Sequence, residues 1–147
     1  MEIDETDKKI INVLLEDSRL SYRQIAKKIK VSVATVMHRI NRLTKEKVIE
    51  GFTAKVDYEK LGYDIDVIIE MAISKGKLFE VERKIATHNN VVAVYDITGN
   101  FDAEVVAKFK TRRDMDKFLK KIQTYDFVEK TNTRLILNTI KEKVLQL

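Results

Sequence analysis

The first fifty residues place apolar side chains at the spacing of amphipathic α-helices. Three segments, 4–17, 21–29 and 32–47, repeat apolar positions three or four residues apart, so we predict three helices. The first opens with acidic residues, the second with a serine-to-glutamine capping box, and the third with Ser32 as N-cap. Because only two residues separate the second and third segments, we expect these helices to cross steeply, as in a helix-turn-helix.

The third segment carries two interlocked patterns. Val36, Ile40 and Leu43 are apolar at helical spacing and predict a face that packs on a core. Polar side chains follow the same spacing on the other face, namely Ser32, Thr35, His38, Arg39 and Arg42. We interpret this second face as a surface for a partner.

Beyond residue 50 the spacing changes to the alternation typical of β-strands. Phe52, Ala54 and Val56 alternate with polar residues, which predicts a short strand and then a linker to about Gly62. Later segments predict strands at 65–74, 91–99, 102–110 and 128–141, and helices at 77–88 and 111–125. The resulting order, β-α-β-β-α-β, is that of a ferredoxin-like domain.

We therefore predict an α+β chain in three parts. Residues 1–50 form a helix-turn-helix domain of winged-helix-like type, and residues 51–63 form a strand linker. Residues 64–147 form a βαββαβ ferredoxin-like domain.

The predicted sheet has one face that its two helices cannot cover. We assign the apolar residues of this uncovered face to Val67, Ile69, Val92 and Val94. A second copy of the chain is the expected cover, so we expect the part from about Asp64 onward to assemble on its own.

Charge is distributed unevenly along the chain. The net charge is +5, but residues 1–18 hold six acids and two lysines, whereas residues 19–47 hold nine bases and one acid. A local basic stripe is what a polyanionic partner such as DNA requires. A solvated charged face is the alternative interpretation.

Composition excludes several classes of protein. The chain has no cysteine and only two histidines, His38 and His88, so we expect no disulfide, no thiolate chemistry and no metal site. No apolar run approaches the roughly 18 residues of a membrane span, and the acidic start is no secretion signal. We therefore expect a cytoplasmic protein without a membrane partner.

Three stretches carry a resemblance to a known family. Residues 7–32 (DKKIINVLLEDSRLSYRQIAKKIKVS), 35–63 (TVMHRINRLTKEKVIEGFTAKVDYEKLGY) and 94–105 (VYDITGNFDAEV) resemble the Lrp/AsnC (feast/famine) transcription regulators. The chain departs from them at Lys30 and Lys47, where members often have the glycine that suits a left-handed helix end. The resemblance implies a sequence-specific regulator that binds double-stranded DNA as a homodimer, with an octamer of four dimers expected.

A helix-turn-helix places its second helix in the major groove with N-terminal residues at base edges. The expected DNA-contacting residues are Ser21, Tyr22, Arg23, Ser32, Ala34, Thr35, His38, Arg39 and Arg42. Two alternatives stay open, because Ser32 could serve only as a cap and Arg39 could pair with an acid of the first helix such as Asp7. A two-fold dimer implies an imperfectly palindromic site.

The resemblance also implies that residues 64–147 are an effector-binding and oligomerisation domain, with an amino-acid effector near the TGNFD turn and no other cofactor. The residues concerned are Gly99, Asn100 and Asp102 in the turn, with Thr131 and Thr133 on the last strand. Turn amides can hold a carboxylate, and Asp102 can hold an ammonium group. The alternative is that Gly, Asn and Asp are ordinary hairpin residues.

Three rival functions would require other sequence features. Small βαββαβ domains include acylphosphatase-like enzymes, but the sequence shows no cysteine nucleophile, glycine-rich phosphate loop or Ser-His-acid set, so we expect no catalytic residues and no enzyme. RNA binding through the sheet would need an aromatic RNP1-type string, and 102–110 does not match it. A metabolite sensor with incidental DNA contact is the third rival.

Overall fold

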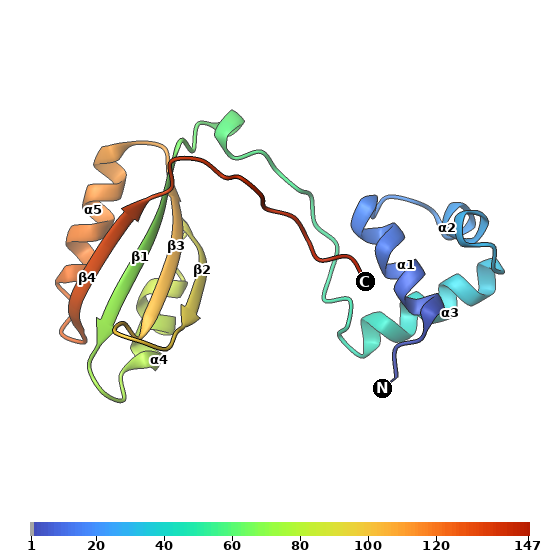
Figure 1. Cartoon of the computed structure of the whole chain (residues 1–147), viewed down its shortest axis with the longest axis horizontal. Coiled ribbons are helices and arrows are strands. Elements are labelled where there is room, and N and C mark those ends of the chain that lie inside the picture. Colours follow the sequence, from blue (N-terminus) through green and yellow to red (C-terminus); the bar gives the residue numbers. More distant parts are fainter. Residues whose placement is uncertain (1) are drawn as a thin grey trace. The chain divides into compact units, whose positions relative to one another are not determined.

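The computed structural model describes residues 2–147, which fold as two compact units (Figure 1). The first unit contains the chain up to Lys55 together with Lys141–Leu147, and its helices are α1 (Glu5–Glu16), α2 (Tyr22–Ile29) and α3 (Val33–Lys45). The second unit is Val56–Ile140. Its elements are the 3₁₀ turn η1 (Glu59–Leu61), β1 (Ile65–Ile73), α4 (Leu78–Val81), the π-helical turn η2 (Glu82–Ala86), β2 (Val91–Asp96), β3 (Ala103–Phe109), α5 (Arg112–Gln123) and β4 (Val128–Leu135).

Local side-chain caps begin the helices of the first unit. Ser21 accepts from the backbone N–H of Gln24 while Gln24 accepts from that of Ser21, and Ser32 accepts from the backbone N–H of Thr35 at 3.0 Å. These bonds confirm the caps predicted for α2 and α3. Asp4 caps α1 in the same reciprocal way with Asp7.

The three helices enclose a small core and leave two strained positions. Ile10, Ile25 and Val36 are fully buried, and Ala26 between them is small enough to let α2 approach α3. Lys30 and Lys47 have φ angles of 59° and 56°, in the left-handed region that favours glycine. Both lysines therefore adopt the conformation that glycine would favour at a helix end.

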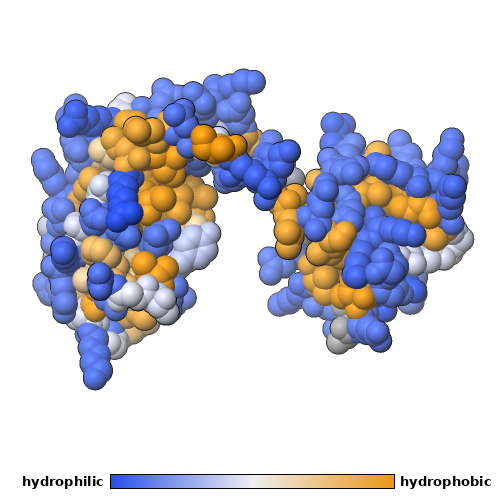
Figure 2. Space-filling model, viewed as in Figure 1, coloured by the Kyte–Doolittle hydropathy of each residue, from blue (hydrophilic) through white to orange (hydrophobic). Residues whose placement is uncertain are grey.

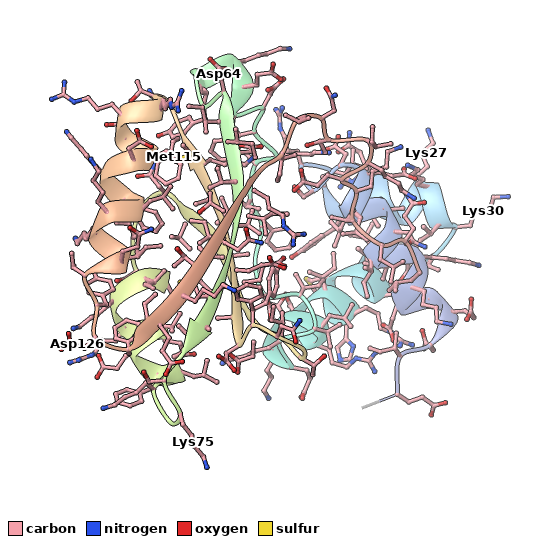
Figure 3. All side chains as sticks on the ribbon, turned by 60° about the vertical axis from the view of Figure 1, so that its left-hand side comes forward. Lys27, Lys30, Asp64, Lys75, Met115 and Asp126 are labelled. Atoms are coloured by element: carbon pink, nitrogen blue, oxygen red, sulfur yellow. The ribbon has the colours of Figure 1, made fainter. Side chains whose placement is uncertain are left out.

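The second unit is a four-stranded antiparallel sheet in the order β2-β3-β1-β4, which confirms the ferredoxin-like arrangement. Alternate residues of β1 and β3 point to one face, where they form a core with the helices. Figure 3 shows both helices on that side of the sheet, with Met115 of α5 directed toward the strands.

The assignment of the uncovered face was wrong for three of four residues. Val67 and Ile69 are fully buried in the core, Val94 packs against that core, and only Val92 is exposed, at 58%. The other set of β1 positions includes Asp66 and Glu70. Burying that set under helices would desolvate two carboxylates, so the more apolar set faces inward.

The open face carries a mixture of apolar and paired charged side chains. Lys108 pairs with Asp66, and Glu70 accepts a hydrogen bond from Asn132 at 2.7 Å and forms an ion pair with Arg134 at 3.0 Å. Figure 2 shows hydrophobic side chains gathered over the strands of this unit between hydrophilic ones.

Three predicted segments differ in the structure. Residues 51–57 form no strand, and Phe52 and Val56 are 55% and 42% exposed. Alternation alone does not make a strand, because strand hydrogen bonds need a neighbour and no described residue supplies one. The helix expected at 77–88 ends as the π-helical turn η2, and β4 stops at Leu135.

Candidate functional site

Helix α3 has the two faces that its sequence predicts. Val36, Ile40 and Leu43 are at most 4% exposed, whereas the N-terminal turn and the opposite face carry the exposed residues Ser32, Ala34 and His38. Thr35, Arg39 and Arg42 are half-buried on α3, and Ser21, Tyr22 and Arg23 are exposed at the start of α2. The structure thus gathers the predicted DNA-contacting residues on the two helices of the helix-turn-helix.

The first turn of α3 holds two hydroxyl groups close together. The hydroxyl oxygens of Ser32 and Thr35 lie 2.8 Å apart, while Ser32 also caps the helix. Capping therefore takes place, and it leaves Ser32 exposed to a partner. Both hydroxyl groups can reach a base edge or a phosphate.

The two arginines of α3 are held by acids of α1. Nη1 of Arg39 donates to Asp4 at 2.6 Å and to both carboxylate oxygens of Asp7 at 3.3 Å, and Nη2 of Arg42 donates to Asp7. The ion-pair alternative for Arg39 is thus formed in the structure. The bonds described for Arg39 use Nη1 alone, so its Nε and Nη2 are free among residues 2–147.

These contacts set the charge state at the surface. The hydrogen bond from the backbone N–H of Asp7 lowers the pKa of Asp4 most, and the hydrogen bond from Arg39 lowers it further. The same hydrogen bond to Asp4 raises the pKa of Arg39. Both groups therefore stay ionised at neutral pH. Sequence reasoning did not assign Asp4 this role, although the acidic start of α1 was the available signal.

The basic surroundings of α2 and α3 remain largely accessible. Lys27 and Lys30 extend from α2 away from the rest of the unit (Figure 3). Lys28 forms an ion pair with Glu16 of α1 at 2.7 Å, so an acid of α1 neutralises part of the basic stripe of residues 19–47. The exposed positions still present cations that can contact phosphates.

The TGNFD turn connects β2 to β3, and its aspartate is tied to β1. Gly99 has a φ of 116°, which requires glycine, and both Gly99 and Asn100 are exposed. Oδ2 of Asp102 accepts from the backbone N–H of Ile73 at 2.7 Å, and its backbone N–H donates to Met71. One oxygen of the Asp102 carboxylate, which was predicted to bind the effector, therefore accepts from the end of β1. The pairing register of β1 with β4 shifts at this end.

The structure brings part of the predicted effector set together. Met71 of β1 lies between Ala103, which follows Asp102, and Thr131 on β4, so Asp102 and Thr131 lie at the same end of the sheet. Thr133 pairs with Ile69, further along. Both threonines share the face of the buried β1 residues, and Thr131 accepts from Gln123 of α5 at 3.3 Å.

Comparisons with known proteins identify the family. Residues 3–50 match the winged helix-turn-helix DNA-binding family, and residues 66–145 match the Lrp/AsnC ligand binding domain. A helix-turn-helix transcriptional regulator of Pyrococcus furiosus is 51% identical over 97% of this chain and 96% of its own. The chain belongs to the Lrp/AsnC family of transcriptional regulators.

Two solved structures share the fold of this regulator. Escherichia coli AsnC has a TM-score of 0.92 at 23% identity and covers 100% of both chains. A Neisseria meningitidis transcriptional regulator in complex with L-methionine has a TM-score of 0.92 at 21% identity, covering 99% of this chain and 96% of that one. The family is one of regulators rather than enzymes.

The C-terminal end of this Lrp/AsnC chain packs on the DNA-binding unit, which sequence reasoning missed. The side-chain amide of Asn12 on α1 donates to the carbonyl of Leu147 at 2.6 Å and accepts from its N–H at 2.8 Å. The expected boundary at residue 64 placed this segment with the second domain. Within residues 2–147, no helix is long and apolar enough to cross a membrane, and no three His, Cys, Asp or Glu gather as a metal site.

Proposed function

We propose that this Lrp/AsnC regulator binds double-stranded DNA as a homodimer and reads a dyad-symmetric site through residues 32–43. The observation that carries the proposal is the exposed N-terminal turn of α3, where Ser32, Ala34 and Thr35 stand at a helix end backed by basic side chains. In a helix-turn-helix this turn meets base edges. A protein that binds the chromosome in this way acts in the cytoplasm.

The open face of the sheet supports the homodimer. Ile68 and Val106 lie opposite each other on β1 and β3, on the face away from the helices, and flanking charges are already paired. A second copy would bury this apolar area. Four such dimers would form the octamer that the family resemblance implies.

The second unit is proposed to bind an amino-acid effector at the turn containing Gly99, Asn100 and Asp102, with Thr131 and Thr133 nearby. Support comes from the match of residues 66–145 to a ligand binding domain and from the L-methionine complex of the Neisseria relative. Oδ2 of Asp102 accepts a hydrogen bond from the backbone N–H of Ile73, whereas Oδ1 accepts none within residues 2–147. An amino acid offers an ammonium group to such an oxygen.

The proposed function is tested by measuring affinity against salt for duplex DNA and single-stranded RNA. A dimer with two basic faces should neutralise roughly 6–10 phosphates, so duplex affinity should fall about 10³–10⁵-fold between 50 and 200 mM salt. Stronger binding to single-stranded RNA would favour the RNA-binding rival. A flat salt response of duplex binding would contradict the proposal.

A further inference from the structure

Two carboxylates at the start of α1 contact α3 in different ways. Asp7 is fully buried and accepts from Arg39, from Arg42 and from the backbone N–H of Asp4 at 3.1 Å. Removing such a buried charge would leave Arg42 without its acceptor and Arg39 with Asp4 alone, so Asp7 is needed for the packing of α1 on α3. The side chain of Asp4 is 47% exposed and contacts only Arg39 among the residues of α3.

The two oxygens of Asp4 have separate tasks. Oδ1 accepts from the backbone N–H of Asp7 at 2.9 Å and caps α1, while Oδ2 accepts from Nη1 of Arg39 at 2.6 Å. Asparagine is as good an N-cap as aspartate. Substitution by asparagine therefore keeps the cap at Oδ1 and removes the anionic contact with Arg39.

We propose that Asp4 is a positioning residue for DNA recognition. Asp4 holds Nη1 of Arg39, so that the edge of the guanidinium group formed by Nε and Nη2 faces the DNA in one orientation. The inference rests on the proposed function and assigns Asp4 the control of specificity. Arginine reads guanine through two parallel hydrogen bonds, so the orientation of its planar group decides whether it reads a base.

The negative charge of Asp4 weakens non-specific binding to DNA. A free arginine on a long side chain turns to the nearest phosphate, and phosphate contacts carry no sequence information. The carboxylate of Asp4 partly neutralises the charge of Arg39. It also repels any phosphate that approaches Arg39. Asp4 thus lowers affinity for all DNA and preserves the difference between the preferred site and random DNA.

Glu5 offers a matched control on the same helix turn. Its side chain is 78% exposed and pairs with Lys8 of α1 at 2.7 Å, with no described contact to α3. Glu5→Gln changes the net charge as Asp4→Asn does, at the neighbouring position. A general electrostatic effect of losing one acid therefore appears in both variants, whereas a positioning effect appears only in Asp4→Asn.

The test compares full-length wild type, Asp4→Asn, Glu5→Gln, Arg39→Ala and the double variant Asp4→Asn/Arg39→Ala. Each binds a preferred duplex, chosen from a random pool, and a random duplex over a salt series, and thermal unfolding checks the fold. We expect Asp4→Asn to bind random DNA roughly two- to fivefold more tightly, the effect of an exposed ion pair. Its salt slope should steepen by about 0.9 for each additional phosphate that the protein neutralises.

The ratio of preferred to random affinity decides the inference. We expect this ratio to fall in Asp4→Asn, to stay at the wild-type value in Glu5→Gln, and to be unaffected by Asp4→Asn once Arg39 is alanine. An unchanged ratio in Asp4→Asn, while wild type still discriminates, would overturn the role of Asp4 alone. A wild type without any preference would overturn the proposed function, and this inference with it.

Discussion

At the scale of single residues, the lysines at 30 and 47 show what local sequence can and cannot decide. Both positions adopt the left-handed conformation that a glycine-containing turn would have, with φ angles of 59° and 56°. Lys30 still closes α2, because its backbone N–H donates to the carbonyl of Ala26. The turn is therefore set by the packing of α2 on α3 rather than by the residue that occupies it.

Replacing Lys30 by glycine should stabilise the protein. Glycine removes the steric cost of the left-handed conformation but adds flexibility to the unfolded chain, so the net gain in unfolding free energy should be about 0.5–1 kcal/mol. Chemical denaturation measures it. As a control, Lys27→Gly inside α2 should lower the unfolding free energy by about 1 kcal/mol. If Lys30→Gly lowered the unfolding free energy, Lys30 would not be strained in the wild type.

Residue-scale predictions succeeded where the deciding contact is local. The caps of Ser21 and Ser32 depend on residues three positions away and were predicted from spacing. The partner of Arg39 lies 32 and 35 positions away, in Asp7 and Asp4, so spacing could name an ion pair only as an alternative to DNA contact. Which role a side chain takes across such a separation depends on tertiary packing.

At the scale of elements, periodicity predicted the helices and the β-α-β-β-α-β order along the chain but not which face of the sheet is covered. The face of β1 was misassigned because alternation identifies two sets of residues without saying where the helices pack. The carboxylates of Asp66 and Glu70 in one set were the signal that decides it. Residues 51–57 alternate as a strand does, but pairing depends on a neighbour that one chain's sequence does not reveal.

The turn between β2 and β3 leads to a prediction about effector binding. Asp102→Asn keeps an oxygen that can accept from Ile73 and removes the charge that would hold an ammonium group. We expect it to lower amino-acid affinity by roughly 1.5–3 kcal/mol, the range for a hydrogen bond to a charged group. Calorimetry against all twenty amino acids measures this loss.

The fold and the DNA affinity without effector serve as controls for Asp102→Asn, and both should be nearly unchanged. Equal binding of an amino acid to both proteins would place the effector site elsewhere. If no amino acid binds the wild type, the turn serves only the closure of β1.

At the scale of the whole molecule, the chain combines a DNA-binding unit and a ligand-binding unit joined by two covalent crossings. One crossing is the linker after residue 55. The other leads from Ile140 into Lys141–Leu147, whose last residue is hydrogen-bonded to Asn12. The linker was visible in the sequence, whereas the returning segment depends on a contact 135 positions apart.

The central claim is that the first turn of α3 reads the DNA sequence, and its most direct test is selection of duplexes from a random pool by wild type, Thr35→Ala and Lys27→Ala. Wild type should enrich an imperfect palindrome. Thr35→Ala should lose about 1–3 kcal/mol of discrimination at one symmetric pair of positions, whereas Lys27→Ala should weaken all duplexes nearly equally. An enriched site without a dyad, or an unchanged site and margin in Thr35→Ala, would contradict the account.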